Sequence, residues 1–159
     1  MNEAINAFVD EYFFLSNFYV APVKYDGILY HNNEAAFQAQ KCADKSDRIK
    51  FADLNPTEAR NMGRKIPLRK DWEQVKISIM SEIVKAKFEQ NPDLAQKLID
   101  TKDTYLEEGN TWGDRTWGTV NGNGANNLGR ILMNVRAEFQ KSKNIKTTSI
   151  HKKNKCYER

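Results

Sequence analysis

Residues 109–127 combine side chains that suit the binding of a polar, ring-bearing small molecule. The segment reads GNTWGDRTWGTVNGNGANN and is rich in glycine and asparagine, with Trp112 and Trp117 in its first half. Glycine lets backbone approach a ligand, asparagine offers both hydrogen-bond donors and acceptors, and tryptophan supplies a flat stacking face. Irregular segments of this length inside a compact domain are usually functional. We therefore expect a binding loop here, with anchoring of the loop to the core as the alternative role of each tryptophan.

Other familiar catalytic and cofactor motifs have no counterpart in the sequence. His31 and His151 are the only histidines, and no Cys/His cluster has the spacing of a zinc site. The run GNGAN matches neither the G-x-G-x-x-G pattern nor the P-loop pattern, and no serine lies in a nucleophile elbow. We therefore predict a protein that uses no metal and no cofactor.

The elements that must position the loop begin with a hairpin and a helix. Residues 12–31 carry aromatic and β-branched side chains around the turn signal Asp26-Gly27, which predicts a short β-hairpin. Asn32 and Asn33 then suit the cap of a helix over the sequence NEAAFQAQKCA.

The rest of the domain is predicted to be helical. Capping residues and apolar side chains at helical spacing mark each helix. The helices are a short one opened by Asn55, Pro56 and Glu58 and closed by Gly63, a long one capped by Asp71 and ending near Asn91-Pro92, a short one over Pro92 to Asp100, and a last amphipathic one marked by Leu128, Ile131, Leu132, Val135 and Phe139. We expect a mainly α (α+β) fold, a compact helical bundle with a small N-terminal β-hairpin, and Thr104 to Glu107 as a further candidate strand.

The length and the charge distribution predict one domain followed by a basic tail. The chain has 159 residues, of which 40% are hydrophobic, which suits a single globular unit. Residues 141–159 hold seven Lys or Arg and one acid, whereas residues 1–140 hold 18 bases and 20 acids. We expect residues 1–140 to form the domain and residues 141–159 to be a flexible tail that is either simply solvated or in contact with nucleic-acid phosphates.

The sequence also favours a cytoplasmic protein without membrane contact. No stretch approaches the ~20 apolar residues of a membrane span. The first ten residues carry two acids and no base, unlike a secretory signal. Cys42 and Cys156 are the only cysteines and lack C-x-x-C spacing, so we expect two free thiols in a reducing compartment.

Five blocks of sequence between residues 12 and 140 match the motifs of one known family in order. They are FLSNFY at 14–19, YDGILYHNNEAAFQAQK at 25–41, GRKIPLRKDWEQVK at 63–76, EGNTWGDRTWG at 108–118 and GANNLGRILM at 124–133. With these blocks the chain resembles the NADAR (YbiA-like) family. The resemblance implies a mainly α-helical fold and N-glycosidase chemistry, directed at phosphorylated riboflavin-pathway intermediates or at ADP-ribosylated guanine in nucleic acid. The family's helix motif usually reads Glu-His, whereas this chain has Glu34-Ala35.

The resemblance implies a pair of catalytic acids. Glu34 aligns with the glutamate of the family's helix motif, and Asp114 aligns with the aspartate of its D-x-x-W-G motif. Hydrolysis of a ribosyl C–N bond builds positive charge on the sugar, which one carboxylate stabilises while another activates water. Either residue could serve as the base. On spacing alone, Glu34 would be a first-turn acid near the helix dipole and Asp114 a turn residue bonded to its own backbone.

The matched motifs also supply candidates for binding the substrate. Lys41 lies seven residues after Glu34, two helical turns on, and is expected to contact a phosphate or hold Glu34 ionised, unless it is a solvated surface lysine. Arg64 and Lys65 are phosphate candidates, or else a surface charge pair. The other candidates are Trp72 for stacking or for the core, Asn17 and Asn126 for ribose hydroxyls or for turns, and Phe18, Trp117 and Gly118.

Three functions remain open at this point. The first is an N-glycosidase that cleaves phosphorylated ribosylamino-pyrimidine intermediates of the riboflavin pathway. The second is a hydrolase that removes ADP-ribose from guanine in nucleic acid, aided by the basic tail. The third is a module that binds NAD or ADP-ribose without catalysis. The oligomeric state is left open by the sequence.

Overall fold

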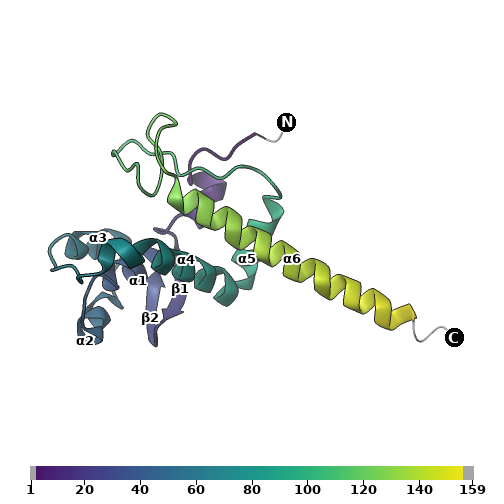
Figure 1. Cartoon of the computed structure of the whole chain (residues 1–159), viewed down its shortest axis with the longest axis horizontal. Helices are drawn as coiled ribbons and strands as arrows, with labels where there is room; N and C mark the ends of the chain where they lie inside the picture. Colours follow the sequence, from purple (N-terminus) through teal and green to yellow (C-terminus); the bar gives the residue numbers. More distant parts are fainter. Residues whose placement is uncertain (1–2, 156–159) are drawn as a thin grey trace.

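The computed structural model of the chain describes residues 3–155, with side chains described to residue 150. Figure 1 shows the order of its elements. They are the 3-10 helix η1 (Asp10–Leu15), β1 (Val20–Tyr25), β2 (Ile28–Asn32), α1 (Asn33–Ala39), α2 (Lys45–Arg48), the 3-10 helix η2 (Ile49–Phe51), α3 (Pro56–Gly63), α4 (Trp72–Gln90), α5 (Pro92–Asp100) and α6 (Asn127–Lys155). The expected mainly α fold with an N-terminal hairpin is confirmed.

The predicted hairpin is present, but it is shorter than the sequence suggested. β1 pairs with β2 in antiparallel fashion across Asp26 and Gly27, whose φ angles are 47° and 80°. Positive φ at both positions is what a tight two-residue hairpin turn requires. The residues before β1 form η1 instead of a strand. The neighbours Phe14 and Leu15 are both buried, whereas adjacent side chains of a strand point to opposite faces.

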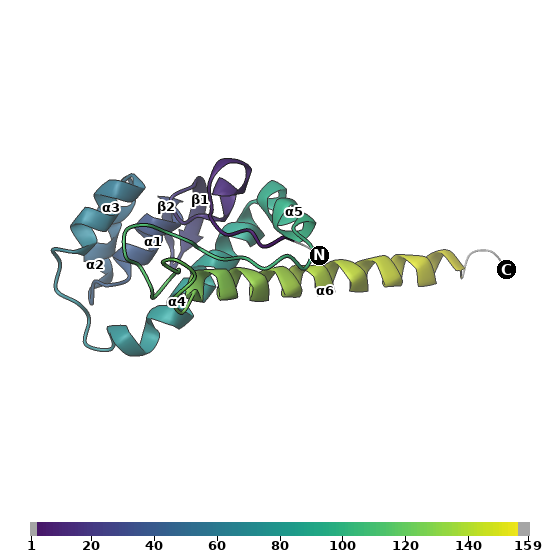
Figure 2. The same cartoon turned by 90° about the horizontal axis from the view of Figure 1, so that it is seen from above.

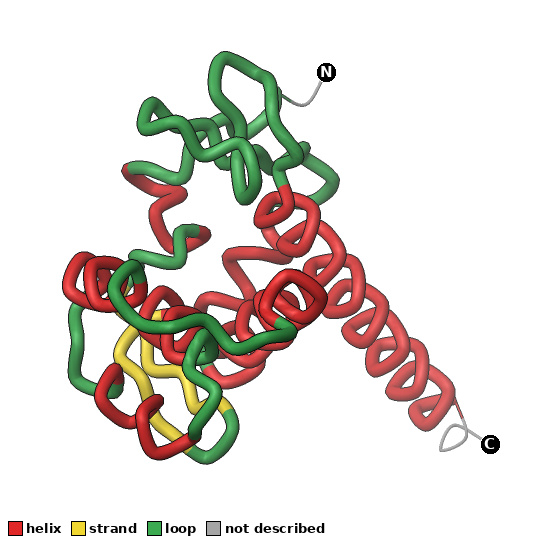
Figure 3. The backbone as a smooth tube through the Cα atoms, turned by 60° about the vertical axis from the view of Figure 1, so that its left-hand side comes forward, coloured by secondary structure: helices red, strands yellow, loops and turns green. Residues whose placement is uncertain are grey.

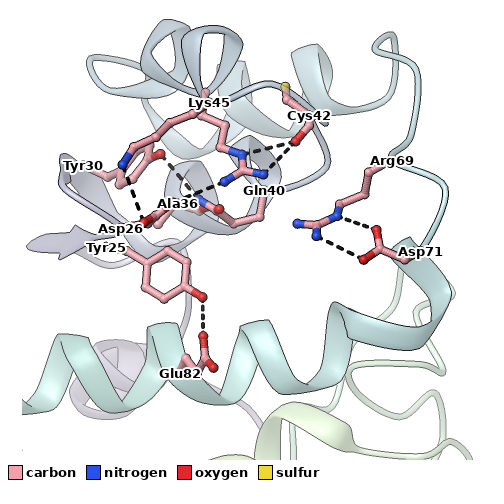
Figure 4. A network of polar contacts seen from close by, with 11 residues as sticks. Tyr25, Asp26, Tyr30, Ala36, Gln40, Cys42, Lys45, Arg69, Asp71 and Glu82 are labelled. Carbon is pink, nitrogen blue, oxygen red and sulfur yellow. Dashed lines mark hydrogen bonds and ion pairs between the residues drawn. The ribbon is translucent and has the colours of Figure 1, made fainter.

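The predicted helix caps are confirmed at two helices, and at a third the predicted residue holds the cap position without a side-chain cap bond. The Asn32 side chain accepts a hydrogen bond from the Ala35 N–H at 2.7 Å, at the start of α1. Asn55 and Glu58 form a complete capping box at the start of α3. Asp71 precedes α4 but makes no side-chain cap bond. Its carboxylate pairs instead with the Arg69 guanidinium at 2.7 Å, as Figure 4 shows.

The long helix α4 carries the predicted apolar rows into the core. Its buried side chains include Trp72, Ile79, Met80, Ile83, Val84 and Phe88. This face packs against β1, α1 and α6. Polar contacts hold the hairpin in place. The Tyr25 hydroxyl donates to the Glu82 carboxylate on α4 (Figure 4). At the hairpin turn, the Arg48 guanidinium donates to the Asp26 carboxylate at 3.3 Å. The hairpin is therefore a fixed support for α1, which follows it directly.

The chain between α5 and α6 is irregular and packs against the N-terminal segment. Thr104 to Glu107 does not form a strand, because its only ladder contact among the described residues is a single parallel bridge between Leu106 and Ile5. Figure 3 shows the N-terminal segment and the loop before α6 at one end of the molecule and the hairpin near the other. The predicted binding loop thus lies against a segment more than 90 residues away in the sequence.

The last helix runs past the predicted end of the domain. α6 extends to Lys155, so the described part of the basic tail is helical. Residues 141–150 are exposed, and Figures 1 and 2 show this part of α6 extending beyond the body. Flexibility of residues 141–159 stays a prediction, and residues 156–159 lie outside the described residues.

Candidate active site

A pocket of about 480 Å³ lies where α1, α3, η1 and the irregular loop meet. Three acids, three bases and several aromatic side chains line it. The acids are Glu34, Glu108 and Asp114, and the bases are Lys41, Arg60 and Arg64. A concave site with convergent polar groups and aromatic walls is the usual form of a small-molecule binding site.

Glu34 enters the pocket from the first turn of α1. The cap at Asn32 fixes the start of this helix, and the Glu34 N–H donates to the Asn17 carbonyl at 3.0 Å. The side chain is buried, and its Oε1 accepts a hydrogen bond from Gln38 Nε2 at 2.9 Å. Burial raises the pKa of Glu34, and the Gln38 hydrogen bond and the charge of Lys41 oppose that rise. This carboxyl is consequently poised to exchange a proton more readily than an exposed glutamate.

Asp114 lies in the irregular loop, in a tight turn that its own side chain stabilises. Its Oδ1 accepts the backbone N–H groups of Thr116 at 3.0 Å and Trp117 at 2.9 Å. The Asn110 side chain holds the same residue from the other side, since its Oδ1 accepts the Asp114 N–H at 3.0 Å. The turn-residue interpretation of Asp114 is therefore correct, and the turn is also what fixes its carboxylate at the pocket.

Glu34 and Asp114 line the same pocket, as their predicted pairing requires. The two acids lie 80 positions apart in the sequence and interact electrostatically, because the charge of Asp114 contributes to the raised pKa of Glu34. Trp112 and Trp117 line the same space. The geometric condition for a catalytic pair beside a stacking surface is met, while the catalytic roles stay predictions.

A third acid, Glu108, was missed by the sequence reasoning. Burial and the nearby charges of Asp114 and Glu34 raise its pKa to about 8. Its Oε2 is buried and has no hydrogen-bond partner among the described residues. The sequence offers two adjacent acids here, Glu107 and Glu108, and nothing in their spacing shows which one faces the pocket.

The cationic side of the pocket differs in part from the prediction. Lys41 and Arg64 line the pocket as expected, although α1 ends at Ala39 and Lys41 lies just beyond it. Arg60 of α3, which the sequence reasoning missed, joins them, with its guanidinium 5.3 Å from the Phe18 ring centre. Lys65 is exposed and is not part of the lining, because α3 has ended before it and its side chain is solvated.

The aromatic candidates divide into pocket and core residues. Phe18 and Trp117 line the pocket. The Trp117 ring packs edge-on against Phe37, with 5.2 Å between ring centres. Trp72 packs on the other side of this contact, 5.1 Å from the Phe37 ring, and is only 5% exposed. Trp72 is a core residue that supports the aromatic wall, whereas Trp112 is 66% exposed and lines the pocket.

Of the remaining candidates, Asn17 lines the pocket, whereas Asn126 and Gly118 shape the loop behind it. Asn126 is 2% exposed, and its side chain accepts the Glu108 N–H at 3.0 Å and donates to the Leu106 carbonyl at 2.9 Å. Gly118 packs so closely that an added Cβ would lie 2.0 Å from the Glu108 carbonyl oxygen. Asn126 and Gly118 therefore position Glu108. Both residues were predicted to contact substrate, but they contact the backbone of the loop instead.

The described residues hold no cluster of three or more His, Cys, Asp or Glu side chains that could bind a metal ion. The three pocket acids thus line one cavity without converging on a single point. No helix in the described part of the chain is long and apolar enough to cross a membrane.

Comparisons with known proteins agree with the fold. A family model described as the NADAR domain matches residues 6–140. N-glycosidase YbiA of Escherichia coli (strain K12) is 40% identical over 134 residues, which are 82% of this chain and 83% of that protein. A riboflavin biosynthesis protein of Vibrio vulnificus (strain YJ016) is 37% identical over 80% of this chain and 35% of that protein. The NMR structure of the E. coli protein YbiA matches with a TM-score of 0.79 and 38% identity, over 90% of this chain and 88% of that chain.

Proposed function

Because the chain belongs to the NADAR domain family and is an N-glycosidase, we propose that its pocket hydrolyses the ribosyl C–N bond of a phosphorylated ribosylamino-pyrimidine. Glu34 and Asp114 are the proposed catalytic pair. The single observation that carries the proposal is their shared pocket, with Trp112 and Trp117 in its wall. The name of the riboflavin biosynthesis relative supports this substrate class.

The charges of the pocket suggest how such a substrate would lie. The charges of Asp114 and Glu34 raise the pKa of Glu108. The charges of Lys41 and Arg60 lower the pKa of Glu34, and Arg64 lowers that of Lys41. We therefore infer that the charge of the pocket changes from negative at one end, near the carboxylates, to positive at the other, near the cations. Guanidinium and ammonium groups bind phosphate through charge-assisted hydrogen bonds, so the phosphate belongs at the cationic end. The scissile bond then lies near the acids and the base near the tryptophans.

The contacts of the two acids support a division of roles between them. Asp114 accepts two backbone N–H bonds through Oδ1, an arrangement that suits a fixed carboxylate, and we assign it the stabilisation of positive charge on the sugar. Glu34 has a raised pKa and a single side-chain hydrogen bond, and we assign it the removal of a proton from the attacking water. The water oxygen bonds to the sugar carbon as the C–N bond breaks.

The experiment is the incubation of purified protein with a 5-phosphoribosylamino-pyrimidine, without added metal, and measurement of released ribose 5-phosphate. Glu34→Gln and Asp114→Asn should each lower kcat by about 10²- to 10⁴-fold, the usual contribution of acid–base and electrostatic groups. Glu73→Gln, at an exposed acid of α4 outside the pocket, is the matched control and should keep full activity. Undiminished turnover in both pocket variants would contradict the proposal.

A second candidate, removal of ADP-ribose from guanine in nucleic acid, is favoured by α6. Its exposed extension carries lysines away from the body, and such a helix suits contact with phosphates (Figure 2). Release of ADP-ribose from a modified oligonucleotide, measured beside the ribosylamine assay, distinguishes the two substrates. The binding module without catalysis is not retained, since relatives across most of this chain are named N-glycosidases.

A further inference from the structure

Glu108 has a buried carboxyl oxygen with no hydrogen-bond partner in the part of the chain that the structure describes. Its side chain lines the pocket, and Oε2 is shielded from solvent without a donor or acceptor among the described residues. A buried polar atom left unpaired is costly, and native structures keep few of them. An unpaired atom that faces a pocket is satisfied when a ligand with a complementary group enters.

The backbone around Glu108 is held rigidly. Its N–H donates to Asn126 Oδ1 at 3.0 Å, and its carbonyl accepts the Thr119 N–H at 2.9 Å. Gly118 packs directly on that carbonyl, where no larger residue fits without movement. On either side, the Glu107 N–H and the Gly109 N–H each donate at 2.9 Å to carbonyls of the N-terminal segment. This carboxyl is consequently presented to the pocket at a fixed place.

The charges that face Glu108 favour its neutral form. The acids Asp114, from the same loop, and Glu34, from α1, both raise its pKa, and burial raises it most. The pocket cations Lys41 and Arg60 lower the pKa of Glu34, whereas the two charges that act on Glu108 are both carboxylates. With a pKa of about 8, this carboxyl holds a proton at neutral pH while facing two other acids. Acids whose environments push their pKa values apart divide the roles of donor and acceptor.

We propose that Glu108 is the proton donor of the reaction, a third catalytic residue that protonates the departing nitrogen. The inference rests on the proposed N-glycosidase function of the same pocket. As the C–N bond breaks, its electron pair stays with nitrogen, which takes the proton of the Glu108 carboxyl. The attacking water bonds to the sugar carbon and gives its proton to Glu34. Proton exchange with solvent then restores both acids, so one water is consumed for each bond cleaved.

The reaction needs a proton for the departing nitrogen, which the catalytic pair does not supply. A ribosylamine nitrogen is a poor leaving group unless it is protonated as it departs. Glu34 and Asp114 are assigned to water activation and to charge stabilisation, and neither role supplies this proton. The cations lie towards the phosphate end of the pocket. Glu108, which lines the same pocket and interacts electrostatically with Asp114 and Glu34, is the acid that remains.

The kinetic test compares Glu108→Gln with Glu107→Gln over a range of pH. Glutamine keeps the shape of the side chain but has no acidic proton. We expect kcat of Glu108→Gln to fall by about 10²-fold or more. In the wild type, kcat/KM should decline as pH rises through about 8, where the donor loses its proton, and this alkaline limb should vanish in Glu108→Gln. Glu107 bonds to Thr119 Oγ1 and is not part of the pocket lining, so Glu107→Gln should keep the wild-type profile.

A conservative variant and a spectroscopic measurement separate a catalytic role from a structural one. Glu108→Asp retains an acidic proton on a shorter side chain, so it should lose rate but keep an alkaline limb. The infrared band of a protonated carboxyl should be present at pH 7 in the wild type and reduced in Glu108→Gln, and in the wild type it should disappear as pH rises through about 8. Wild-type activity and an unchanged pH profile in Glu108→Gln would overturn this proposal alone. Failure of the wild type to release ribose 5-phosphate would overturn the proposed function with it.

Discussion

Glu34 occupies a position that favours chemistry over stability. The residue is 9% exposed, and burial is the largest cause of its raised pKa. Folding therefore disfavours the ionised form that the proposed water-activating step requires. Lys41 and Arg60 reduce this penalty through their charges without removing it. Functional sites commonly hold such perturbed groups, and their removal often stabilises the fold.

Replacement of Glu34 by glutamine should therefore raise stability while it abolishes turnover. A carboxyl with a raised pKa binds more protons when folded, so the wild type loses stability as pH rises from 4.5 through the folded pKa. A glutamine at this position does not ionise, so the variant does not lose stability in this way. Its side-chain oxygen can still accept the hydrogen bond from Gln38. We expect a gain of about 1 kcal/mol near pH 7, or roughly 2–4 °C in Tm.

Thermal unfolding of the wild type and Glu34→Gln at two pH values checks this expectation. The difference should be larger at neutral pH and should shrink towards pH 4.5, where the carboxyl becomes protonated in both the folded and the unfolded wild type. Glu73→Gln serves as the control, since Glu73 is exposed. Equal Tm values at pH 7 would show that burial of Glu34 costs the fold nothing.

The sequence predicted the pocket residues whose neighbours in the chain determine their position. Glu34 follows a local helix cap, and Asp114 builds its own turn, so both lie where their motifs indicated. Glu108 could not be told from Glu107, because bonds to the N-terminal segment decide which of the two faces the pocket. Trp72 is suited by type to stacking on a substrate, but its ring packs against Phe37 in the core instead.

Helices and strands, like single residues, could be predicted where local signals determine them and not where distant contacts do. The hairpin, α1 and α3 have strong local signals in their turn and capping residues. The hairpin turns, and the two helices begin, where those signals place them. In the segment between α5 and α6 only the Val120–Asn123 bridge is local, and the other bridges join Leu106 to Ile5 and Gly109 to Thr119. Pairing between distant segments cannot be read from local spacing. The length of α6 was underestimated for a different reason, since its exposed part has no apolar row to mark it.

The helix α4 holds the pocket wall through a buried lysine. Lys87 lies four residues after Ile83 on the apolar face and is 1% exposed. Its Nζ donates to the Phe14 carbonyl at 2.6 Å and to the Ser16 carbonyl at 3.1 Å. The next residue, Asn17, lines the pocket. Lys87 thus ties α4 to the end of η1, and burial lowers its pKa to about 7.

Lys87→Met should destabilise the protein by an amount that grows with pH. Methionine replaces the aliphatic stem but leaves two buried carbonyls without their donor, at a cost of about 1–3 kcal/mol. Between pH 7 and 10.5 the unfolded chain binds more protons at Lys87 than the folded chain does, so this group's contribution to wild-type stability rises with pH across that window. The deficit of the variant should therefore be smallest below pH 7.

Thermal unfolding of both proteins at several pH values between 6 and 10 measures this change. Lys85→Met is the control, because Lys85 is an exposed lysine of the same helix and its pKa is raised. Its difference from the wild type should not grow over this range. A deficit of Lys87→Met that stays constant with pH would contradict a buried lysine with a lowered pKa.

At the scale of the whole molecule, charge is separated between the body and the end of α6. Residues 1–140 hold slightly more acids than bases, whereas residues 141–159 hold seven bases and one acid. Figure 2 shows α6 running from the irregular loop past α5 and away from α1 and α3, the helices that line the pocket. A small phosphorylated substrate would occupy the pocket without touching the basic extension, while a long nucleic acid could reach both.

Deletion of residues 141–159 should consequently separate the two candidate substrates. The deleted part of the described chain is exposed and lies beyond the core residues of α6, so the body should keep its fold and its kcat/KM for a ribosylamine. Affinity for an ADP-ribosylated oligonucleotide should fall, and the slope of log K against log salt should flatten by about 0.7 for each single-strand phosphate that the lysines no longer neutralise. Replacement of Lys141, Lys143 and Lys146 by glutamine keeps the helix and removes charge alone, so it should reproduce part of the effect. If the deletion leaves oligonucleotide affinity and its salt dependence unchanged, α6 gives no support to the nucleic-acid substrate, and the small-molecule reaction stands as the function of this pocket.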